Sequence, residues 1–397
     1  MFTCVEAGSV DISFWPVLHF SHRMNYSRFL TTVSKNRQPS LIRDLTSLLT
    51  NASPELVFMA GGLPNPQMFP FQAASVTMKD GRALTIHPKL MTDCLQYLPT
   101  PGYPPLIKQL KALTEKIHAP PCWVDSELIV TAGSQDGLCK ALEMMINQGD
   151  YLITQEPCYT GTLSILNPYQ PRYLPVTADH EGMNPEALKA VLSQWQPQDV
   201  RDAEEGVPKD FHPSFLSMDT DGRVLRFDSF SKVLSSGLRV GFVTGPKPLI
   251  QRILLHKQVS ILHAPAMSQV LVSELLHLWG EEGFFRHIRA VQDFYLKQRN
   301  AMLEAAKKHL TGLCEWAVPT GGMFLWLKVP RVPDTWDMIM ERALEKNVIL
   351  VPGKAFMCDP SLPCQYMRAA FSVITPEQME KGLESLAELI CEEIALQ

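Results

Sequence analysis

A short serine-rich loop combines residue types that together can hold a phosphate group next to a reactive carbonyl. Ser229 and Ser231 flank Phe230, Lys232 follows directly, and Arg239 comes seven residues later. Hydroxyl groups donate hydrogen bonds to phosphate oxygens, and a guanidinium group can bind two of these oxygens at once. A lysine amine in such a pocket can form a Schiff base with a carbonyl carbon. From the residue types alone, a solvated surface loop is an equally good interpretation.

A second candidate site lies where a predicted strand leads into a helix. Ser134 and Gln135 begin that helix, and the free N–H groups and positive dipole end of a helix N-terminus favour an anion. A serine at this position is more often only an N-cap. Tyr159 follows the next predicted strand, which would bring its ring to the same edge of the sheet. It is either a core residue or a platform for a cofactor.

One cation near the C-terminus lies in an apolar segment. Arg368 is part of Tyr366-Met367-Arg368-Ala369-Ala370, which is predicted to be a strand. An unpaired buried charge destabilises a fold by several kcal/mol, so this guanidinium group needs an anionic partner. The partner is either a Glu or Asp of the protein itself or a substrate carboxylate bound by two nitrogen atoms.

Alternating strands and helices must position these residues. Glu127–Thr131 is an apolar strand, a helical pattern begins at Ser134, and Tyr151–Thr154 is a further strand. Such a strand-helix-strand unit is typical of a parallel sheet with helices on its faces. The other elements predicted in this part of the chain are strands at Val224–Phe227 and Val240–Thr244 and amphipathic helices from Pro248 onward.

A smaller α+β unit is predicted towards the C-terminus. Strands at Phe324–Val329 and Val348–Val351 flank a helix over Asp334–Lys346, and the last helix begins with a capping box of Thr375 and Gln378. The apolar stripe of that helix predicts that it packs on the rest of the unit; it consists of Met379, Leu383, Leu386 and Ile390. The predicted fold class is therefore α/β, with a large domain built on a mostly parallel sheet and a smaller α+β domain.

Composition excludes several classes of protein. The net charge of −5 over 397 residues provides no broad basic surface for nucleic acid or an anionic membrane. No apolar run approaches the ~18 residues of a membrane-spanning helix. The nine cysteines are scattered without the spacing of a metal site or a disulfide framework, which predicts a reducing compartment and no metal.

The order of the motifs resembles that of pyridoxal-phosphate-dependent class I aminotransferases of fold type I. The resemblance covers nearly everything from Met24 to the C-terminus, and the run from Ser229 to Lys232 with Arg239 is its most specific part. Within the family, the chain is most similar to the branch that acts on kynurenine and 2-aminoadipate. The matching stretches are Phe58-Met59-Ala60-Gly61-Gly62-Leu63-Pro64, Gln96-Tyr97, Gly133-Ser134-Gln135, Glu156-Pro157-Cys158-Tyr159, Ser229-Phe230-Ser231-Lys232, Gly237-Leu238-Arg239 and Arg368.

The resemblance implies a role for each candidate residue. Lys232 would be the catalytic Schiff-base lysine and proton shuttle, Tyr159 would stack on the pyridine ring, and Arg368 would bind the substrate α-carboxylate. The phosphate of pyridoxal 5′-phosphate would be held by Ser134, Gln135, Ser229, Ser231 and Arg239. The substrate side would be lined by Arg43, Gly62 and Tyr97, with Tyr97 reaching across a dimer interface.

The resemblance also implies domains, partners and a compartment. Residues 1–45 would be an N-terminal extension and arm, 70–310 the large cofactor-binding domain, and 46–69 with 311–397 the small domain. The implied partners are amino acids, 2-oxo acids such as 2-oxoglutarate, and a second copy of the chain in a homodimer. Family members of this branch are usually mitochondrial, which implies the matrix, with the cytoplasm as the alternative. The basic, acid-free stretch after Met24 fits a presequence or a mobile arm, whereas 1–23 fits neither a secretory signal nor a presequence.

One part of the family pattern is missing. Only 72 residues separate Tyr159 from Lys232, and none of them forms the strand ending in Asn-Pro-x-Gly or the later strand with an Asp and a Tyr. These residues would contact the pyridine nitrogen and the phenolic oxygen of the cofactor. We expect an internal deletion near 209–210 of one strand-helix-strand segment, a unit of ~30 residues or more. The alternative function is therefore a catalytically impaired isoform that only dimerises or binds the cofactor weakly.

Overall fold

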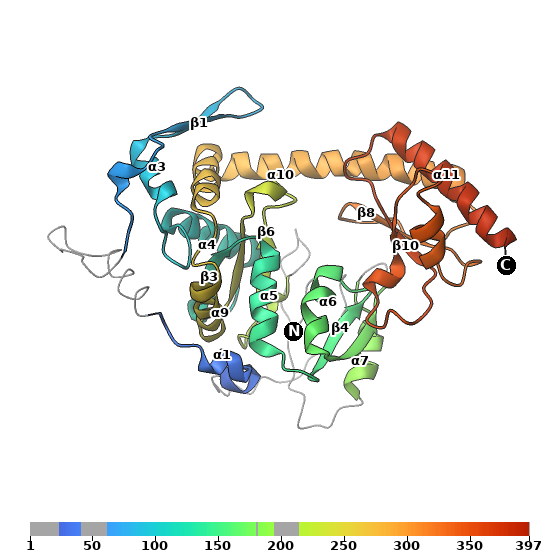
Figure 1. Cartoon of the computed structure of the whole chain (residues 1–397), viewed down its shortest axis with the longest axis horizontal. Helices are drawn as coiled ribbons and strands as arrows, with labels where there is room; N and C mark the ends of the chain where they lie inside the picture. The colour runs from blue at the N-terminus through green and yellow to red at the C-terminus, as the bar shows by residue number, and fades with distance from the viewer. Residues whose placement is uncertain (1–23, 41–61, 180–181, 194–213, 397) are drawn as a thin grey trace. The chain divides into compact units, whose positions relative to one another are not determined.

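The structure is a computed structural model that describes residues 24–40, 62–179, 182–193 and 214–396 (Figure 1). Arg43, the segment 1–23 and the predicted junction at 209–210 lie outside the described residues. The chain divides into two compact units. One consists of Met1–Leu152, Ile165–Arg172 and Gln198–Phe284, and the other of Ile153–Ser164, Tyr173–Pro197 and Phe285–Gln397.

The first unit is built on a three-stranded sheet. Its strands are β3 (Ser126–Thr131), β7 (Gly241–Pro246) and β6 (Arg226–Ser229), in that order, and β7 is antiparallel to both neighbours. Helices α4 (Pro104–His118), α5 (Ser134–Met145) and α9 (Lys247–Ser260) pack around it. The core between the sheet, α5 and α9 contains Ile129, Ala141, Met144, Leu225, Val243, Leu249, Ile250 and Ile253. Strand β3, helix α5 and the strands on either side of the serine-rich loop are thus confirmed, the last two shifted by one to two residues.

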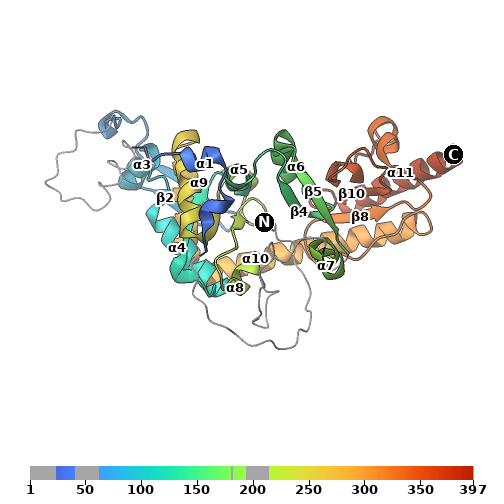
Figure 2. The same cartoon turned by 90° about the horizontal axis from the view of Figure 1, so that it is seen from below.

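The remaining elements of this unit surround that core. Helix α1 lies against α5, where the Thr31 N–H donates to the Met144 carbonyl over 2.8 Å (Figures 1 and 2). The antiparallel hairpin of β1 (Ala74–Thr77) and β2 (Ala83–Ile86) precedes α3 (Pro88–Leu95). The short elements are η1 (Tyr26–Phe29), α1 (Thr32–Asn36), η3 (Pro66–Met68), η4 (Trp123–Asp125), α8 (Phe215–Met218) and η7 (Ser236–Leu238).

The prediction that β3 and the next strand belong to one parallel sheet is wrong for the described residues. The next strand, β4 (Tyr151–Glu156), pairs instead with β5 (Arg172–Thr177) in a separate two-stranded sheet. Within the described part of the chain, β6 has β7 as its neighbour on one side and no strand on the other. A strand-helix-strand pattern identifies the elements but not the partner of each strand, and among the described residues β3 pairs with β7 and β4 with β5.

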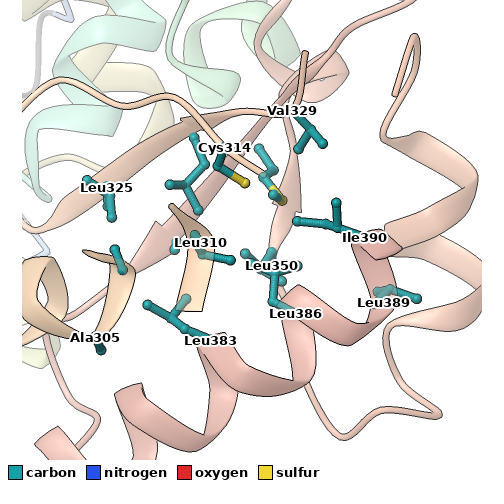
Figure 3. Close-up of a cluster of buried hydrophobic side chains, with 14 of the residues drawn as sticks. Ala305, Leu310, Cys314, Leu325, Val329, Leu350, Leu383, Leu386, Leu389 and Ile390 are labelled. Carbon is teal, nitrogen blue, oxygen red and sulfur yellow. The ribbon is translucent and has the colours of Figure 1, made fainter. Parts of the chain in front are cut away.

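The second unit contains a smaller sheet covered by helices. Strands β8 (Phe324–Lys328), β10 (Tyr366–Ala370) and β9 (Val351–Pro352) pair antiparallel in that order. Figure 3 shows buried side chains from the strands and from α11 (Pro376–Ala395) meeting in one cluster, among them Leu325, Leu350, Leu383, Leu386 and Ile390. The other elements are α6 (Thr160–Leu166), α7 (Pro185–Ser193), η9 (Gly353–Phe356) and α10 (Ala266–Leu310), which begins in the first unit and is interrupted at Gly280. The short η5 (Asn167–Tyr169), which follows α6, belongs to the first unit.

Two predictions for this unit hold and two need correction. Strand β8 and the capping box are confirmed: Thr375 Oγ1 accepts from the Gln378 N–H over 3.3 Å, and the Gln378 side chain accepts from the Thr375 N–H over 2.9 Å. In place of a regular helix over 334–346, the structure has a π-helical segment at Met338–Arg342 followed by a turn. The strand predicted at 348–351 is reduced to β9.

Candidate active site

The candidate site of the first unit is a turn that brings a glycine, a helix N-terminus and an arginine together. Gly133 joins β3 to α5 with φ of +83°, and among the described residues no side chain caps the helix there. A Cβ atom on Gly133 would lie 2.5 Å from Nη2 of Arg239. Only glycine therefore leaves room for the guanidinium group at this position. The turn therefore places this cation at the N-terminus of α5, where the first N–H groups have no intrahelical acceptor, and the combination is suitable for a phosphate.

Arg239 connects the serine-rich loop to that turn. Its Nη1 atom lies 3.4 Å from Oγ of Ser231 and 3.2 Å from the Ser236 carbonyl, and its Nη2 atom lies 3.4 Å from the Ala132 carbonyl. These distances are long for hydrogen bonds, and the side chain is exposed, so its N–H groups can turn to an oxyanion. Ser229 accepts from the Ser231 N–H over 3.1 Å, which fixes the two hydroxyl groups relative to each other.

The backbone around Lys232 is held by its buried neighbours, while its own side chain is exposed. Phe230 is buried, its N–H donates to the Val240 carbonyl over 3.1 Å, and its carbonyl accepts from the Leu234 N–H over 2.8 Å. Lys232 therefore lies on a turn anchored on both sides, at the end of β6 that also carries Ser229. The structure thus brings Ser134, Ser229, Ser231, Lys232 and Arg239 to one end of the first unit's sheet.

The carboxylate next to this loop is already paired. Asp228, on β6, is half-buried and accepts from Nε and Nη2 of Arg226 over 2.8 to 3.1 Å. Its charge is therefore balanced within the protein. Asp210, at the predicted junction, lies outside the described residues. For the pyridine end of the cofactor, the described residues thus supply no carboxylate at the place that the family pattern leads us to expect.

A separate candidate site in the second unit is centred on Arg368. Its guanidinium carbon lies 4.0 Å from the centre of the Phe324 ring and 4.8 Å from that of Phe356. Nε is buried and has no hydrogen-bond partner among the described residues, and none of their carboxylates forms an ion pair with it. Burial lowers the pKa of this guanidinium group, and the nearby Tyr159 counteracts the effect. The alternative of a structural Glu or Asp partner finds no support here.

The three other predicted positions differ in their surroundings. Tyr159 is 58% exposed, so its interpretation as a core residue is wrong. Tyr97 is 47% exposed, and its ring meets that of His263 edge-on at 6.1 Å between centroids. Around Gly62 the structure is open, with no described atom within 4 Å of the position of a Cβ. Their roles stay predictions.

Two features of the site were not assigned from the sequence. The motif that contains Gly133 assigns this glycine no role of its own. Its position between the end of a strand and the start of a helix nevertheless signals a special backbone conformation. The stacking of Phe324 and Phe356 on Arg368 joins residues from β8, η9 and β10. No local pattern in the sequence signals such a contact.

Comparisons with known proteins agree with this geometry. Residues 202–386 match the family model described as aminotransferase class I and II. The chain is 42% identical to the mitochondrial kynurenine/alpha-aminoadipate aminotransferase of Bos taurus and 44% identical to that of Mus musculus, in both cases over 94% of this chain and 100% of the relative.

Solved structures are similar along almost the whole chain. An aminotransferase from Candida albicans superposes with a TM-score of 0.80 at 22% identity, covering 94% of this chain and 99% of that one. A kynurenine aminotransferase from Pyrococcus horikoshii, solved in complex with PMP, reaches a TM-score of 0.70 at 27% identity, with 93% and 98% covered.

The alignment with the cattle enzyme also has a length difference. It spans 425 positions, whereas 94% of the 397 residues of this chain is about 373 residues. About 50 aligned positions therefore have no counterpart in this chain. A difference of this size can accommodate one strand-helix-strand segment of ~30 residues or more.

Proposed function

Because the chain belongs to the class I and II aminotransferases, we propose that it moves an amino group from kynurenine or 2-aminoadipate to a 2-oxo acid such as 2-oxoglutarate. It is an enzyme of fold type I that uses pyridoxal phosphate. The choice of substrates rests on the two mammalian relatives, which are named for kynurenine and alpha-aminoadipate.

The observation that carries the proposal is the turn at Gly133. A phosphate monoester would bind beside this turn, because the Arg239 guanidinium group lies against Gly133 at the N-terminus of α5 and its Nη1 atom is 3.4 Å from the Ser231 hydroxyl. Ser134, Gln135 and Ser229 complete the set of residues that would hold the phosphate. Each of these groups can donate a hydrogen bond to an oxyanion.

Lys232 would supply the amine and the proton transfers. Pyridoxal phosphate, when bound, provides an aldehyde and an electron-withdrawing ring. The anchored turn around Lys232 would hold the Nζ atom beside the phosphate-binding groups, where it can take a proton from the substrate Cα and return it. Since Asp228 is paired with Arg226, the contacts to the pyridine ring of the cofactor would have to come from other residues.

On the second unit, Arg368 would bind the α-carboxylate of the substrate. Its buried Nε lacks a partner among the described residues, and a carboxylate would satisfy both this atom and the charge. Phe324 and Phe356 fix the plane of the guanidinium group. Tyr159 would stack on the cofactor ring, and its exposed side chain is free to do so.

We further propose the mitochondrial matrix as the compartment and a homodimer as the assembly. The mammalian relatives are named as mitochondrial. In the homodimer, the exposed Tyr97 would reach the site of the partner subunit, and Arg43 and Gly62 would line the substrate side. Among the described helices, none is both long and apolar enough to cross a membrane.

The decisive experiment is reduction of the purified protein with borohydride after addition of pyridoxal phosphate. We expect a pyridoxyl label on the peptide that contains Lys232, and no label on this peptide in Lys232→Ala. Lys247→Ala is the matched control, since Lys247 is also an exposed lysine of the first unit. Transfer to 2-oxoglutarate is then measured with kynurenine and with 2-aminoadipate. Labelling elsewhere would contradict the assignment, and labelling without turnover would favour the impaired isoform, which no comparison favours.

A further inference from the structure

A lysine outside the predicted site is completely buried in the first unit. Lys257, in the last turn of α9, has 0% of its side chain exposed. Its Nζ atom donates to the Thr100 carbonyl over 2.5 Å and also to the Val130 carbonyl. Thr100 and Val130 are themselves buried, so water cannot replace the ammonium group as a donor.

These two carbonyl groups belong to segments that lead to different parts of the site. Val130 lies on β3, three residues before Gly133. Thr100 lies in the loop after Tyr97, and the neighbouring Pro101 accepts from the Val130 N–H over 2.8 Å. Both backbone groups of Val130 are therefore bound on the edge of β3 that faces away from β7. Lys257 and this loop take the place of a neighbouring strand.

The loop is also fixed at its other end. Gly102 has φ of +136°, and a Cβ there would lie 2.8 Å from the Val130 side chain. The Tyr103 N–H donates to the Gln269 side chain over 2.8 Å, and Gln269 donates in turn to the Ala264 carbonyl over 2.7 Å. The loop thus lies so close to β3 that a shift of one would move the other.

The charges around Lys257 indicate that its role is to donate hydrogen bonds and not to form an ion pair. Asp136, whose charge acts on the Lys257 amine, forms an ion pair with Lys140. No carboxylate among the described residues accepts a hydrogen bond from Lys257, and burial lowers the pKa of its amine to about 7. A neutral amine still has two N–H groups for the two carbonyl groups. An apolar side chain would avoid the desolvation of the amine, but would leave both carbonyl groups without a donor.

We propose that Lys257 is a positioning residue for the cofactor site: it binds the loop 99–103, which follows Tyr97, to the end of β3 that leads into the phosphate-binding turn at Gly133. The inference rests on the proposed function. It predicts that loss of the two hydrogen bonds loosens the turn and the loop together, although Lys257 itself touches neither cofactor nor substrate.

The test compares Lys257→Met with Lys247→Met. Both lysines lie on α9 and donate to a backbone carbonyl, but Lys247 is exposed and bonds Val124 at the far end of β3 from the turn. For Lys257→Met we expect the dissociation constant of pyridoxal phosphate to rise about tenfold or more. Amide exchange at 98–103 and 131–135 should become faster. Lys247→Met should leave both unchanged.

A second variant keeps the test decisive if Lys257→Met does not fold. Gly102→Ala places a methyl group against Val130 and displaces the same loop without altering Lys257. We expect the same two effects from it. A folded Lys257→Met with unchanged exchange in both segments would overturn the inference. Because exchange is measured on the cofactor-free chain, this result is independent of whether the protein binds pyridoxal phosphate at all.

Discussion

Replacing Gly133 by alanine should weaken cofactor binding through the displacement of Arg239. The new Cβ would lie 2.5 Å from Nη2 and 3.1 Å from Cζ of Arg239, distances at which the guanidinium group has to move. Because Arg239 also contacts the loop of Ser231, its movement would separate the two sides of the phosphate-binding turn.

The size of the effect follows from two contributions. A residue with a Cβ at φ of +83° and ψ of 164°, a region that essentially only glycine adopts, destabilises the fold by about 1–3 kcal/mol relative to glycine. Loss of a hydrogen bond from a charged group to the phosphate is equivalent to about 1.5–3 kcal/mol. Only the second contribution acts on cofactor affinity, and it corresponds to a rise of about 10- to 150-fold in the dissociation constant of pyridoxal phosphate.

A matched control separates the two contributions. Gly149 has a similar φ of +78°, and no described atom lies within 4 Å of the position of its Cβ. Gly149→Ala should therefore lower the melting temperature as Gly133→Ala does, but leave the absorbance titration with pyridoxal phosphate unchanged. If the two variants bind the cofactor equally well, Arg239 does not hold the phosphate in the way that we infer.

Three further predictions concern other parts of the molecule. Arg368→Gln should raise the KM for the amino acid substrate by about 30-fold or more, because it removes a bidentate charge-assisted pair; an unchanged KM in steady-state kinetics would assign Arg368 a structural role. The pKa of Lys257 is about 7 in the folded protein and 10.5 for a free lysine, so between these values the unfolded chain binds more protons and stability rises with pH. In urea unfolding, wild type should therefore gain about 1.4 kcal/mol per pH unit over Lys257→Met, and a constant difference between pH 7 and 9 would contradict the burial argument. Thr375→Ala should lower the unfolding free energy by about 1 kcal/mol, because the capping box of α11 loses its acceptor, while cofactor binding stays as in wild type.

Elements defined by short-range patterns could be predicted from the sequence. The apolar run before Gly133 and the helical spacing after it define β3 and α5, because both patterns arise from neighbouring residues. The same holds for α11, where Thr375 and Gln378 are three residues apart. In these segments the local preferences and the observed fold agree.

The segment after Asp334 could not be predicted in the same way. Its buried side chains include Met338, Ile339 and Ala343. Met338 and Ala343 are five residues apart, and residues at this spacing do not lie on the same face of a regular α-helix. A π-helical segment bonds residues five apart and turns more slowly, which places both against the core. The requirement comes from packing in the second unit, so the apolar pattern alone suggested an ordinary helix.

Strand pairing is the other property that local patterns leave undetermined. The sequence predicts both β3 and β4, but a run of apolar residues does not indicate which other strand it will pair with. In the structure β3 pairs with β7, more than 100 residues later, and its free edge is covered by a loop and by Lys257. In the same way β4 pairs with β5, a partner that the apolar pattern of β4 does not identify.

Lys257 shows why chemistry can be predicted more readily than position. In the sequence it is a basic residue in the last turn of a helix, a place where a cation normally faces water and complements the helix dipole. Its two acceptors, Thr100 and Val130, lie 157 and 127 residues earlier in the chain. Spacing could indicate Ser231, Lys232 and Arg239 because these residues act from a single loop. A donor that closes the edge of a distant strand is defined only by the fold, and a buried lysine without a carboxylate partner is the structural signal that identifies it.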